Sequence, residues 1–423
     1  SCQGCPLAGD MLGFVPDEVV EAPVFILGQG PGADEERAGR PFVGKTGTDM
    51  ENTYFPLAGL ERGAVSIGNT IRCRWQRNGR RTDDLPTGRT LVDAADHCGT
   101  AHLRIPESTQ LVIAQGALAW KWTQGKLSER GETWSISNWR GFLGSERLHD
   151  RPVYAVLHLA DLYRDRKMTS VSRLDWKKVP AILGGSWPQP VPPPLVLDGT
   201  NDDQMEDYFD EASRTDYLAL DTEFTPDNLL TLIGLGWRAG TETHGLQLRW
   251  LHGNATTRTR RRFIQRLRDV VSRGQPRIVF HNALADIPVL RESLSIVVPW
   301  EYIDDTMLAD ACLWPELPHD LGFLASRYSK HTKLKHLAKE DQLAYNWGDV
   351  LATLDSWEAL KAGLATDCGA SSDYRSQRLP LLPIIQEAHD HGIQVNQQRV
   401  EAALREYRSR CDEAARLTAA WCG

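Results

Sequence analysis

A run of prolines near the middle of the chain constrains its architecture more than any other feature. Residues 184–194 read GGSWPQPVPPP, and repeated prolines oppose both helix formation and sheet pairing, so they favour an extended, semi-rigid spacer. The chain has 423 residues, and at about 100 to 200 residues per domain each side of the spacer can form its own core. We therefore predict a domain at 1–182, a spacer at 183–198, a second domain at 199–370 and a helical region at 371–423.

Both predicted domains alternate short apolar runs with helix-like stretches. Short apolar runs bounded by turn residues are typical of buried strands, and apolar residues at helical spacing indicate helices. The fold class that follows is α/β for each domain, with a helical segment behind them. The predicted strands are Val24–Leu27, Leu111–Ala114, Tyr217–Leu220, Leu232–Gly236 and Arg277–Phe280, and the predicted helices cover 257–272, 349–360 and 400–417.

Composition sets limits on location and partners. Apolar residues make up 41% and charged residues 25% of the chain, and no run reaches the roughly 18 apolar residues of a membrane span. Because the sequence also lacks a secretory signal pattern, we expect a soluble, cytoplasmic protein with no membrane partner. The net charge of −8 argues against a uniformly basic coat, but it leaves room for a local basic groove.

Four cysteines and a glycine-rich turn stand out in the first domain. Cys2 and Cys5 form a CxxC pair, and Cys73 and Cys98 would complete a four-thiolate site for zinc or an iron-sulfur cluster. From spacing alone, buried thiols without a metal are an equal alternative. The strand at 24–27 runs into a GQGPG turn whose amides can approach a phosphate or a base. Residues 39–46 fit the Walker A pattern, but the charged residues before them exclude the strand that this loop requires.

These motifs carry a resemblance to a known family. GQGPG at 28–32 followed by GRPFVG at 39–44 resembles the family 4 type of uracil-DNA glycosylase, which carries a [4Fe-4S] cluster. Three further segments match in order across most of residues 1–180: NTIRC at 69–73, VIAQGA at 112–117 and HLA at 158–160.

The resemblance implies a cluster and a base pocket. It implies that Phe42 stacks on a flipped base, Asn69 reads the uracil edge and His158 lies near the glycosidic bond. Gln29 stands where the family has an acidic residue, and Leu159 replaces a proline. Because an amide cannot act as a base, we expect base or DNA binding without excision, with uracil excision as the alternative. The implied cluster ligands are Cys2, Cys5, Cys73 and Cys98.

Arginines gather around Cys73, with one tryptophan among them. Such a mixture suits phosphate contact and base stacking on single strands, while a solvated loop is the alternative. The neighbouring motifs favour DNA contact. The residues concerned are Arg72, Arg74, Trp75, Arg77, Arg80 and Arg81.

The second domain carries acids in a distinctive order. Asp221 and Glu223 lie at i and i+2 of a strand, which places both on one face. Asp286 follows another strand, and Tyr345 and Asp349 are neighbours on one helix face. Carboxylates grouped in this way attract divalent cations, and an acidic surface is the weaker alternative.

This order resembles the DEDDy exonucleases of the ribonuclease H-like fold, specifically the proofreading domain of family A DNA polymerases, over about residues 210–365. The resemblance implies that Asp221, Glu223, Asp286 and Asp349 hold two Mg²⁺ or Mn²⁺ ions while Tyr345 orients the attacking water. Asn282, in the Asn-x-x-x-Asp segment, is an expected DNA contact, and Asp305 an expected supporting residue. The expected activity is stepwise removal of 5′-mononucleotides from a 3′ end.

The remaining segments suggest a replicative setting. Residues 380–395 resemble the junction from exonuclease to thumb in family A polymerases, and we find no palm or fingers motif. The expected protein is the amino-terminal part of a phage-type polymerase in the host cytoplasm, with single-stranded and primer-template DNA and a palm and fingers fragment as partners. A repair enzyme with an active glycosylase and a non-catalytic DNA or polymerase-binding scaffold are the alternatives. The arginines at 258–268 fit a solvated face and a DNA contact equally well.

Overall fold

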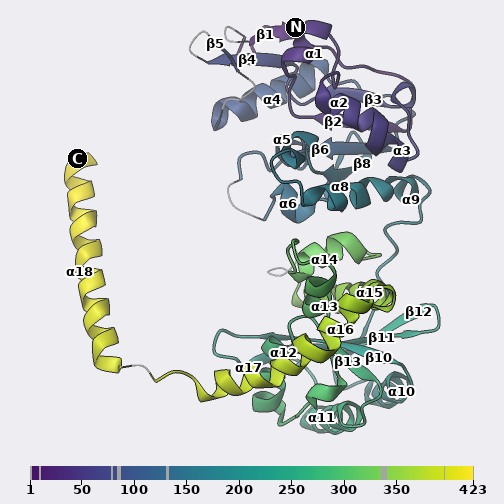
Figure 1. Cartoon of the computed structure of the whole chain (residues 1–423), viewed down its shortest axis with the longest axis vertical. Coiled ribbons are helices and arrows are strands. Elements are labelled where there is room, and N and C mark those ends of the chain that lie inside the picture. The colour runs from purple at the N-terminus through teal and green to yellow at the C-terminus, as the bar shows by residue number, and fades with distance from the viewer. Residues whose placement is uncertain are drawn as a thin grey trace. The chain divides into compact units, whose positions relative to one another are not determined.

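The computed structural model of the chain describes residues 2–8, 11–77, 80–82, 87–129, 133–334, 341–394 and 396–422. It divides into a compact unit of residues 1–379 and a second unit of residues 380–423. The first unit holds two separate sheet-centred domains, and the second consists of helices (Figure 1). The predicted class, two α/β domains followed by a helical segment, is confirmed.

The first domain is built on a five-stranded sheet of order β3-β2-β6-β8-β7. Its strands are parallel except for β7, which pairs antiparallel with β8. Every residue of β2 and β6 is buried, as expected for central strands covered on both faces. The strands are β2 (Val24–Gly28), β3 (Ser66–Asn69), β6 (Leu111–Gln115), β7 (Leu143–Leu148) and β8 (Arg151–Val156).

A small antiparallel sheet and a set of short helices complete the first domain. The small sheet has the order β1-β4-β5, with β1 at Met11–Phe14, β4 at Cys73–Arg77 and β5 at Arg80–Thr82. The core is rich in aromatic side chains, among them the fully buried Trp120, Trp139 and Trp176. The helices are α1 (Ala33–Ala38), α2 (Lys45–Asp49), η1 (Met50–Tyr54), α3 (Phe55–Leu57), η2 (Arg62–Ala64), α4 (Arg89–His102), α5 (Ala117–Thr123), α6 (Ile136–Trp139), α7 (Leu159–Leu162), α8 (Met168–Lys177) and α9 (Val179–Leu183).

The second domain is built on a six-stranded mixed sheet of order β14-β13-β10-β11-β12-β9. Strands β10, β11 and β12 form an antiparallel meander, and β13 and β14 extend it in parallel. The end of the predicted spacer differs from expectation, because Leu195–Leu197 forms β9 and pairs with β12. The other strands are β10 (Tyr217–Phe224), β11 (Leu230–Ala239), β12 (Glu242–Arg249), β13 (Arg277–Phe280) and β14 (Ile303–Asp305).

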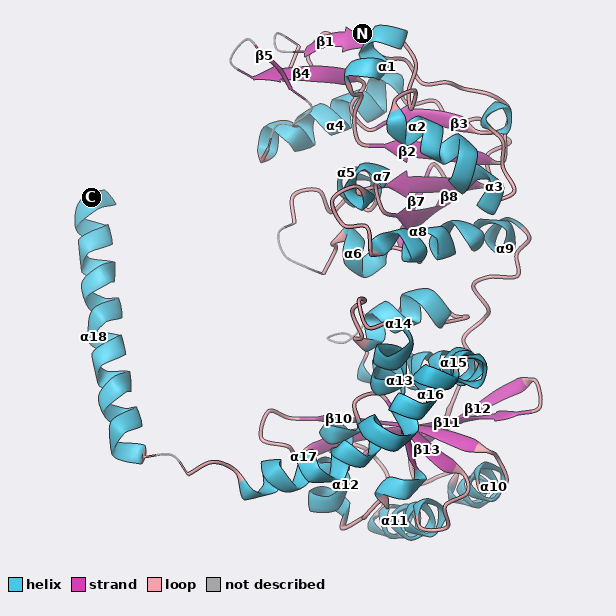
Figure 2. Ribbon diagram, viewed as in Figure 1, coloured by secondary structure: helices cyan, strands magenta, loops and turns pink. Residues whose placement is uncertain are grey.

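Helices cover both faces of this sheet (Figure 2). The long helix α15 packs closely on one face, because a Cβ at Gly234, Gly236 or Gly245 would overlap its side chains. Trp237 points to the other face, where its Nε1 donates to Glu211 of α10 at 3.1 Å. The helices are α10 (Asp202–Ala212), α11 (Thr257–Val271), α12 (Ala283–Leu294), η3 (Trp300–Tyr302), α13 (Thr306–Leu313), α14 (Leu321–Tyr328), α15 (Gln342–Thr366), α16 (Cys368–Asp373) and η5 (Tyr374–Arg378).

Buried polar contacts join the two domains of the first unit. Arg140 forms a bidentate pair with Asp175 at 2.7 and 2.5 Å, and its Nη1 donates to Ser326 Oγ of α14 at 2.7 Å. Lys178 Nζ donates to the carbonyl of Ser326 at 2.8 Å, and Trp187 Nε1 to the carbonyl of Ser329 at 3.1 Å. The residues between the domains are therefore packed segments of the unit and not a free spacer.

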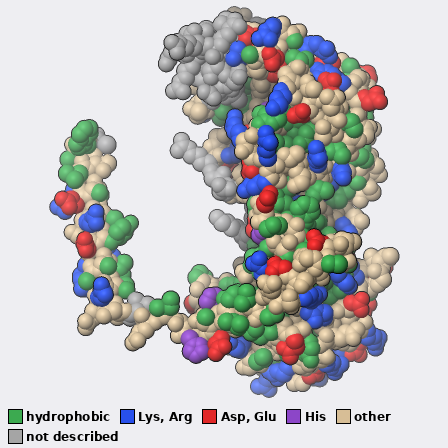
Figure 3. All heavy atoms as spheres, viewed as in Figure 1, with side chains coloured by type: hydrophobic (Ala, Val, Ile, Leu, Met, Phe, Trp, Pro, Cys, Tyr) green, Lys and Arg blue, Asp and Glu red, His purple; other side chains and the backbone are tan. Residues whose placement is uncertain are grey.

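The second unit consists mainly of α17 (Leu379–His391) and α18 (Gln397–Cys422). Apolar side chains lie along α18 and are visible in the space-filling view (Figure 3), with Tyr407 68% and Trp421 93% exposed. Within the described part of the chain, no helix is long and apolar enough to cross a membrane.

Candidate active site and base pocket

Three carboxylates meet where β10 lies beside α15. Asp221 and Glu223 alternate along β10 on the face that α15 covers, and Asp349 comes from the second turn of α15. One oxygen from each of these residues lies within 4.8 Å of the others. The predicted proximity of strand and helix acids is thus present, although 126 to 128 residues separate them in sequence.

Asp286, the fourth predicted ligand, lies in the first turn of α12 beside this group. Its Oδ1 accepts hydrogen bonds from the amide and hydroxyl of Thr222, at 2.8 and 2.6 Å. Burial raises the pKa of Asp286 to about 7, against the lowering effect of these bonds. Burial and the charges of Asp286, Asp349 and Glu223 raise the pKa of Asp221 well above its usual range. Carboxylates crowded in this way are stabilised by a cation between them.

Tyr345 lies one helical turn before Asp349 on the same face of α15. Burial and the charges of Asp349 and Glu223 raise the pKa of its phenol above the ordinary value. The hydroxyl therefore stays protonated near neutral pH, so it can donate or accept a hydrogen bond but cannot act as a base.

Two residues that the sequence analysis did not single out support the acids. Thr222 bonds Asp286, and Asn346 Nδ2 donates to Asp221 Oδ2 at 2.7 Å. Thr222 lies between Asp221 and Glu223, and Asn346 follows Tyr345. Their positions inside these motifs were the one sequence feature that could have marked them as part of the site. Their contacts depend on how α12 and α15 pack on the sheet, which local spacing does not give.

Asp305 and Asn282 lie at helix starts near the acids. Asp305 accepts hydrogen bonds from the amides of Met307 and Leu308 at 2.9 and 3.1 Å, and from that of Ala283 at 2.7 Å. It thereby caps α13 and holds the start of α12, which confirms its supporting role. Asn282 precedes α12 with a left-handed backbone, φ 67°, and its DNA contact stays a prediction.

The residues expected to form a base pocket converge at the ends of β2 and β3. Gly28 ends β2 between Asn69 and Phe42, because a Cβ at this glycine would lie 2.5 Å from Asn69 Oδ1 and 2.6 Å from the Phe42 ring. Phe42 is buried and has a left-handed backbone, φ 55°, and its amide donates to Glu35. The Asn69 side chain is buried too, and its Nδ2 finds no acceptor among the described residues.

Gln29 and His158 face each other across Gly116, whose added Cβ would lie 3.0 Å from both side chains. Gln29 Oε1 accepts a hydrogen bond from the amide of Leu118, in the first turn of α5, at 3.3 Å. His158 Nδ1 accepts one from the amide of Ala160 at 3.2 Å, and burial lowers the pKa of the imidazole. His158 is therefore neutral near pH 7 with its hydrogen on Nε2.

The four predicted cluster ligands interact electrostatically. Burial and the neighbouring thiols of Cys98, Cys2 and Cys5 raise the pKa of Cys73 to about 12. Among the residues that the structure describes, no three of these sulfurs lie within 4.8 Å of one another. A tetrahedral zinc site, with bonds of about 2.3 Å, requires sulfurs about 3.8 Å apart. By its chemistry, a set of four thiols without a carboxylate suits either zinc or an iron-sulfur cluster.

Two arginines of the predicted basic surface lie inside the first domain and are paired with acids. Arg72 is buried and forms a salt bridge with Asp17 at 2.6 Å, while its Nη1 donates to the carbonyl of Cys98 at 3.3 Å. This position argues against a DNA contact, because the guanidinium is already paired inside the domain. Arg74 faces Glu36 at 3.4 Å and is largely buried. Strands β4 and β5 carry the remaining residues, whose side chains lie outside the described part of the chain: Trp75, Arg77, Arg80 and Arg81.

The arginines of α11 also have structural partners. Arg262 and Arg266 pair with Glu206 of α10 at 2.8 and 3.0 Å. Since α10 covers the sheet face opposite the acids, these pairs stabilise helix packing there. Over the face seen in Figure 3, Lys and Arg side chains are interspersed with those of Asp and Glu.

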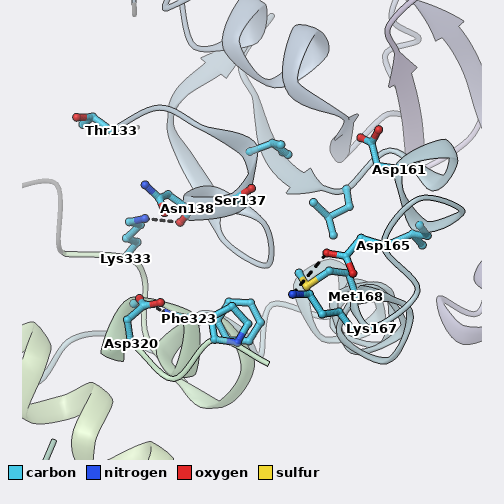
Figure 4. A pocket seen from close by; sticks show the side chains of 15 residues that line it. Thr133, Ser137, Asn138, Asp161, Asp165, Lys167, Met168, Asp320, Phe323 and Lys333 are labelled. Carbon is cyan, nitrogen blue, oxygen red and sulfur yellow. Dashed lines mark hydrogen bonds and ion pairs between the residues drawn. The ribbon is translucent and has the colours of Figure 1, made fainter. Parts of the chain in front are cut away.

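A cavity of about 720 Å³ lies elsewhere, between α6 and α7 of the first domain and α14 of the second. Figure 4 shows Lys333 reaching the Asn138 carbonyl and Asp165 paired with Lys167 at its rim. Its lining includes none of the clustered carboxylates. Three acids, Asp161, Asp165 and Asp320, outnumber its two lysines, so the rim does not favour phosphate binding.

The second domain places clustered carboxylates beside a mixed sheet, an arrangement suited to divalent-metal chemistry. Comparison with known proteins agrees. Residues 16–179 match the model of the uracil DNA glycosylase superfamily, and residues 199–364 match that of a 3′-5′ exonuclease. The chain therefore contains a glycosylase-like domain fused to a 3′-5′ exonuclease domain, and the second domain makes it an enzyme.

Individual relatives match over shorter lengths. The type-4 uracil-DNA glycosylase of Pyrobaculum aerophilum is 40% identical over 79 residues, which cover 18% of this chain and 40% of that protein. The type-4 uracil-DNA glycosylase of Thermotoga maritima is 32% identical over 119 residues, 28% of this chain and 58% of that protein. The catalytic core of RRP6 from Trypanosoma brucei has a TM-score of 0.35 and 19% identity, covering 45% of this chain and 52% of that one.

Proposed function

We propose that the chain is a divalent-metal-dependent exonuclease that removes 5′-mononucleotides from the 3′ end of DNA. The observation that carries the proposal is the group formed by Asp221, Glu223 and Asp349, with oxygens within 4.8 Å of one another. Carboxylate oxygens are the ligands that Mg²⁺ and Mn²⁺ prefer. Acids exposed at the surface would keep ordinary pKa values, whereas burial raises the pKa values of Asp221 and Asp286.

The residues fit a pair of such ions. Asp221, Glu223 and Asp349 would hold one ion, and Asp286, beside Asp221, would share in holding a second. Bound Mg²⁺ or Mn²⁺ supplies charge neutralisation on the phosphate and lowers the pKa of bound water. Tyr345, protonated and adjacent to Asp349, would orient the attacking water through its hydroxyl.

We further propose a proofreading role in a phage-type family A polymerase, with primer-template DNA as substrate and the host cytoplasm as location. The resemblance of residues 380–395 to an exonuclease-thumb junction supports this setting. A polymerase fragment with palm and fingers would then be the partner.

The test uses a 5′-labelled single-stranded oligonucleotide with Mg²⁺. We expect the wild-type chain to shorten it stepwise from the 3′ end, and Asp221→Ala/Glu223→Ala to lose about a thousandfold or more of the rate, because the ion would lose two ligands. Asp203→Ala, an exposed acid of α10, is the matched control and should keep full activity. Metal-dependent shortening by the double variant would contradict the assignment, and no shortening by the wild type would favour a non-catalytic scaffold.

For the first domain we propose base binding without excision and a [4Fe-4S] cluster held by Cys2, Cys5, Cys73 and Cys98. The buried Asn69 Nδ2, which has no acceptor within the described part of the chain, could donate to a base carbonyl, and the neutral His158 can donate from Nε2. Gln29 supplies no carboxylate to activate water or to balance a developing positive charge on the sugar. The cluster would tie the amino-terminal segment to β4 and α4, which carry Cys73 and Cys98.

Gln29→Asp tests this proposal by restoring a carboxylate. We expect no free uracil from a labelled oligonucleotide with the wild type, and measurable release with Gln29→Asp, because the pocket already holds the other groups. Gln29→Asn, which keeps an amide, is the control. Release of uracil by the wild type would instead favour the repair enzyme. Iron and sulfide in equal amounts in the purified chain, lost in Cys73→Ser, would support the cluster.

A further inference from the structure

A row of three residues crosses the sheet of the exonuclease domain at the acidic site. Asp221 of β10 lies opposite Gly234 of β11, and Gly234 lies opposite Gln247 of β12. Directly opposed residues of neighbouring strands project to the same face. The middle position has no side chain, so a gap separates the Asp221 carboxylate from the Gln247 amide.

Asn346 of α15 fills this gap. It is fully buried, and its Nδ2 donates to Asp221 Oδ2 at 2.7 Å while its Oδ1 accepts from Gln247 Nε2 at 2.8 Å. A Cβ at Gly234 would overlap Asn346 Oδ1. The glycine is therefore required for this bridge between carboxylate and amide.

The direction of the bridge is fixed by a backbone carbonyl. Gln247 Nε2 also donates to the carbonyl of Leu343 at 2.9 Å, and a carbonyl can only accept. The Gln247 amide must therefore present its nitrogen to both Leu343 and Asn346, and Gln247 Oε1 has no partner among the described residues. Asn346 must therefore direct its Oδ1 toward Gln247 Nε2, so its Nδ2 faces Asp221.

We propose that Asn346 is a positioning residue that holds the Asp221 carboxylate in the orientation required to bind a divalent cation. A nitrogen donor at 2.7 Å fixes the position of one carboxylate oxygen. The hydrogen bonds of Gln247 Nε2 to the Leu343 carbonyl and to Asn346 Oδ1 keep the Asn346 side-chain amide from flipping. The inference rests on the metal-dependent nuclease proposed above, and it adds a residue that does not itself touch the ion.

Two glycines of β11 allow a matched test. Gly234 and Gly236 lie on the same face, and an added methyl group at either would press on α15. At Gly234 the methyl group meets Asn346, whereas at Gly236 the nearest side chains are Val350, Leu354 and Trp347. Gly234→Ala and Gly236→Ala therefore disturb helix packing alike, and only the first disturbs the bridge. Asn346→Asp keeps the shape of the side chain but places an oxygen against Asp221.

The measurement is the Kd for Mn²⁺, obtained from the electron paramagnetic resonance signal of the free ion without substrate. We expect Gly234→Ala and Asn346→Asp to raise the Kd about tenfold or more, as when a group that orients a metal ligand is lost, and Gly236→Ala to leave it within about twofold. Mn²⁺ should restore activity of Asn346→Asp only at a correspondingly higher concentration. Because Asn346→Asp adds no bulk, it remains informative if Gly234→Ala fails to fold.

Two results would overturn the inference. One is an equal Kd for Gly234→Ala and Gly236→Ala, or a wild-type Kd for Asn346→Asp. Either outcome would mean that Asn346 contributes only to packing, and the proposed nuclease function would still stand. A wild-type chain that binds no Mn²⁺ and shortens no oligonucleotide would overturn the proposed function itself, and the positioning role with it.

Discussion

At the scale of single residues, the acidic site brings negative charges together and supports them with hydrogen-bond donors. Thr222 donates twice to Asp286, and Asn346 donates to Asp221. These bonds offset only part of the effect of burial and mutual repulsion, since the pKa values of both acids stay raised. Without a bound metal, Asp221 and Asp286 in the folded state therefore keep their protons to a higher pH than they would in the unfolded chain.

This proton uptake predicts a pH dependence. Because the folded-state pKa of Asp286, about 7, lies above its value of 3.8 in an ordinary setting, its ionisation destabilises the metal-free fold as pH rises through that interval. Bound cations must displace these protons, so the affinity for Mn²⁺ should rise from about pH 6 to about pH 8.

Asp286→Asn tests the dependence. The amide oxygen still accepts from Thr222 and carries no charge. At about pH 8 without metal, we therefore expect the variant to be more stable than the wild type by about 1–3 kcal/mol in unfolding free energy, with a higher melting temperature. Mn²⁺ affinity should be weaker and flatter with pH. A melting temperature below that of the wild type at every pH would contradict the raised pKa. Asp203→Asn serves as the control.

At the scale of elements, short apolar runs predicted five strands and missed others, including β8 with its buried apolar residues 153–156. The sequence analysis found β2, β6, β10, β11 and β13, but it left out β12, whose ETHGLQLR sequence mixes polar residues and glycine. Its central residues are buried because α15 packs on Gly245, a tertiary contact. The sequence order of the acids predicted the site, whereas the role of Asn346 depends on strand register.

The same limit explains Arg72 and the arginines of α11. Their charge suggested a DNA surface, but Asp17 and Glu206, which are distant in sequence, pair with them. Sequence reveals charge, and only the fold reveals which charges are already neutralised.

Asp305 yields a prediction about the elements that carry the site. Asp305→Ala removes the acceptor for amides at the starts of α12 and α13, so we expect a loss of about 2–4 kcal/mol in urea unfolding. Asp305→Asn keeps an acceptor oxygen and should lose less. Mn²⁺ affinity should change little, because Asp305 is outside the carboxylate group. Lost Mn²⁺ affinity with normal stability would indicate a metal ligand instead.

At the scale of the whole first unit, the two domains are joined by groups that are costly to bury unless they stay paired. Lys178 donates to the carbonyls of Gly141 and Ser326, one from each domain, and Arg140 with Asp175 lies beside it. Separating the domains would remove the bonds from Arg140 and Lys178 to Ser326 and expose the buried Arg140–Asp175 pair to water. The domains should therefore unfold together in a single transition.

Lys178 makes this junction sensitive to pH. Burial lowers the pKa of Lys178 from 10.5 to about 8, with the charge of Asp175 opposing it. The folded state thus binds fewer protons than the unfolded chain between these values, and the contribution of Lys178 to stability becomes more favourable as pH rises through them. The stability of the wild type relative to Lys178→Met should grow by about 1–2 kcal/mol over that interval. The exposed neighbour Lys177→Met should show no such trend.

The packed stretch before β9 decides where the nuclease can be cut free. Trp347, next to Asn346, donates through Nε1 to the carbonyl of Pro192 at 2.6 Å, and the amide of Gln189 donates to the carbonyl of Lys330 at 2.7 Å. A fragment starting at residue 199, where sequence places the domain, would lose both bonds and strip β9 from β12, leaving an open sheet edge prone to aggregation. A fragment that starts at Gln189 or earlier keeps the whole sheet. We therefore expect this longer fragment, and not the one that starts at residue 199, to fold and to retain nuclease activity.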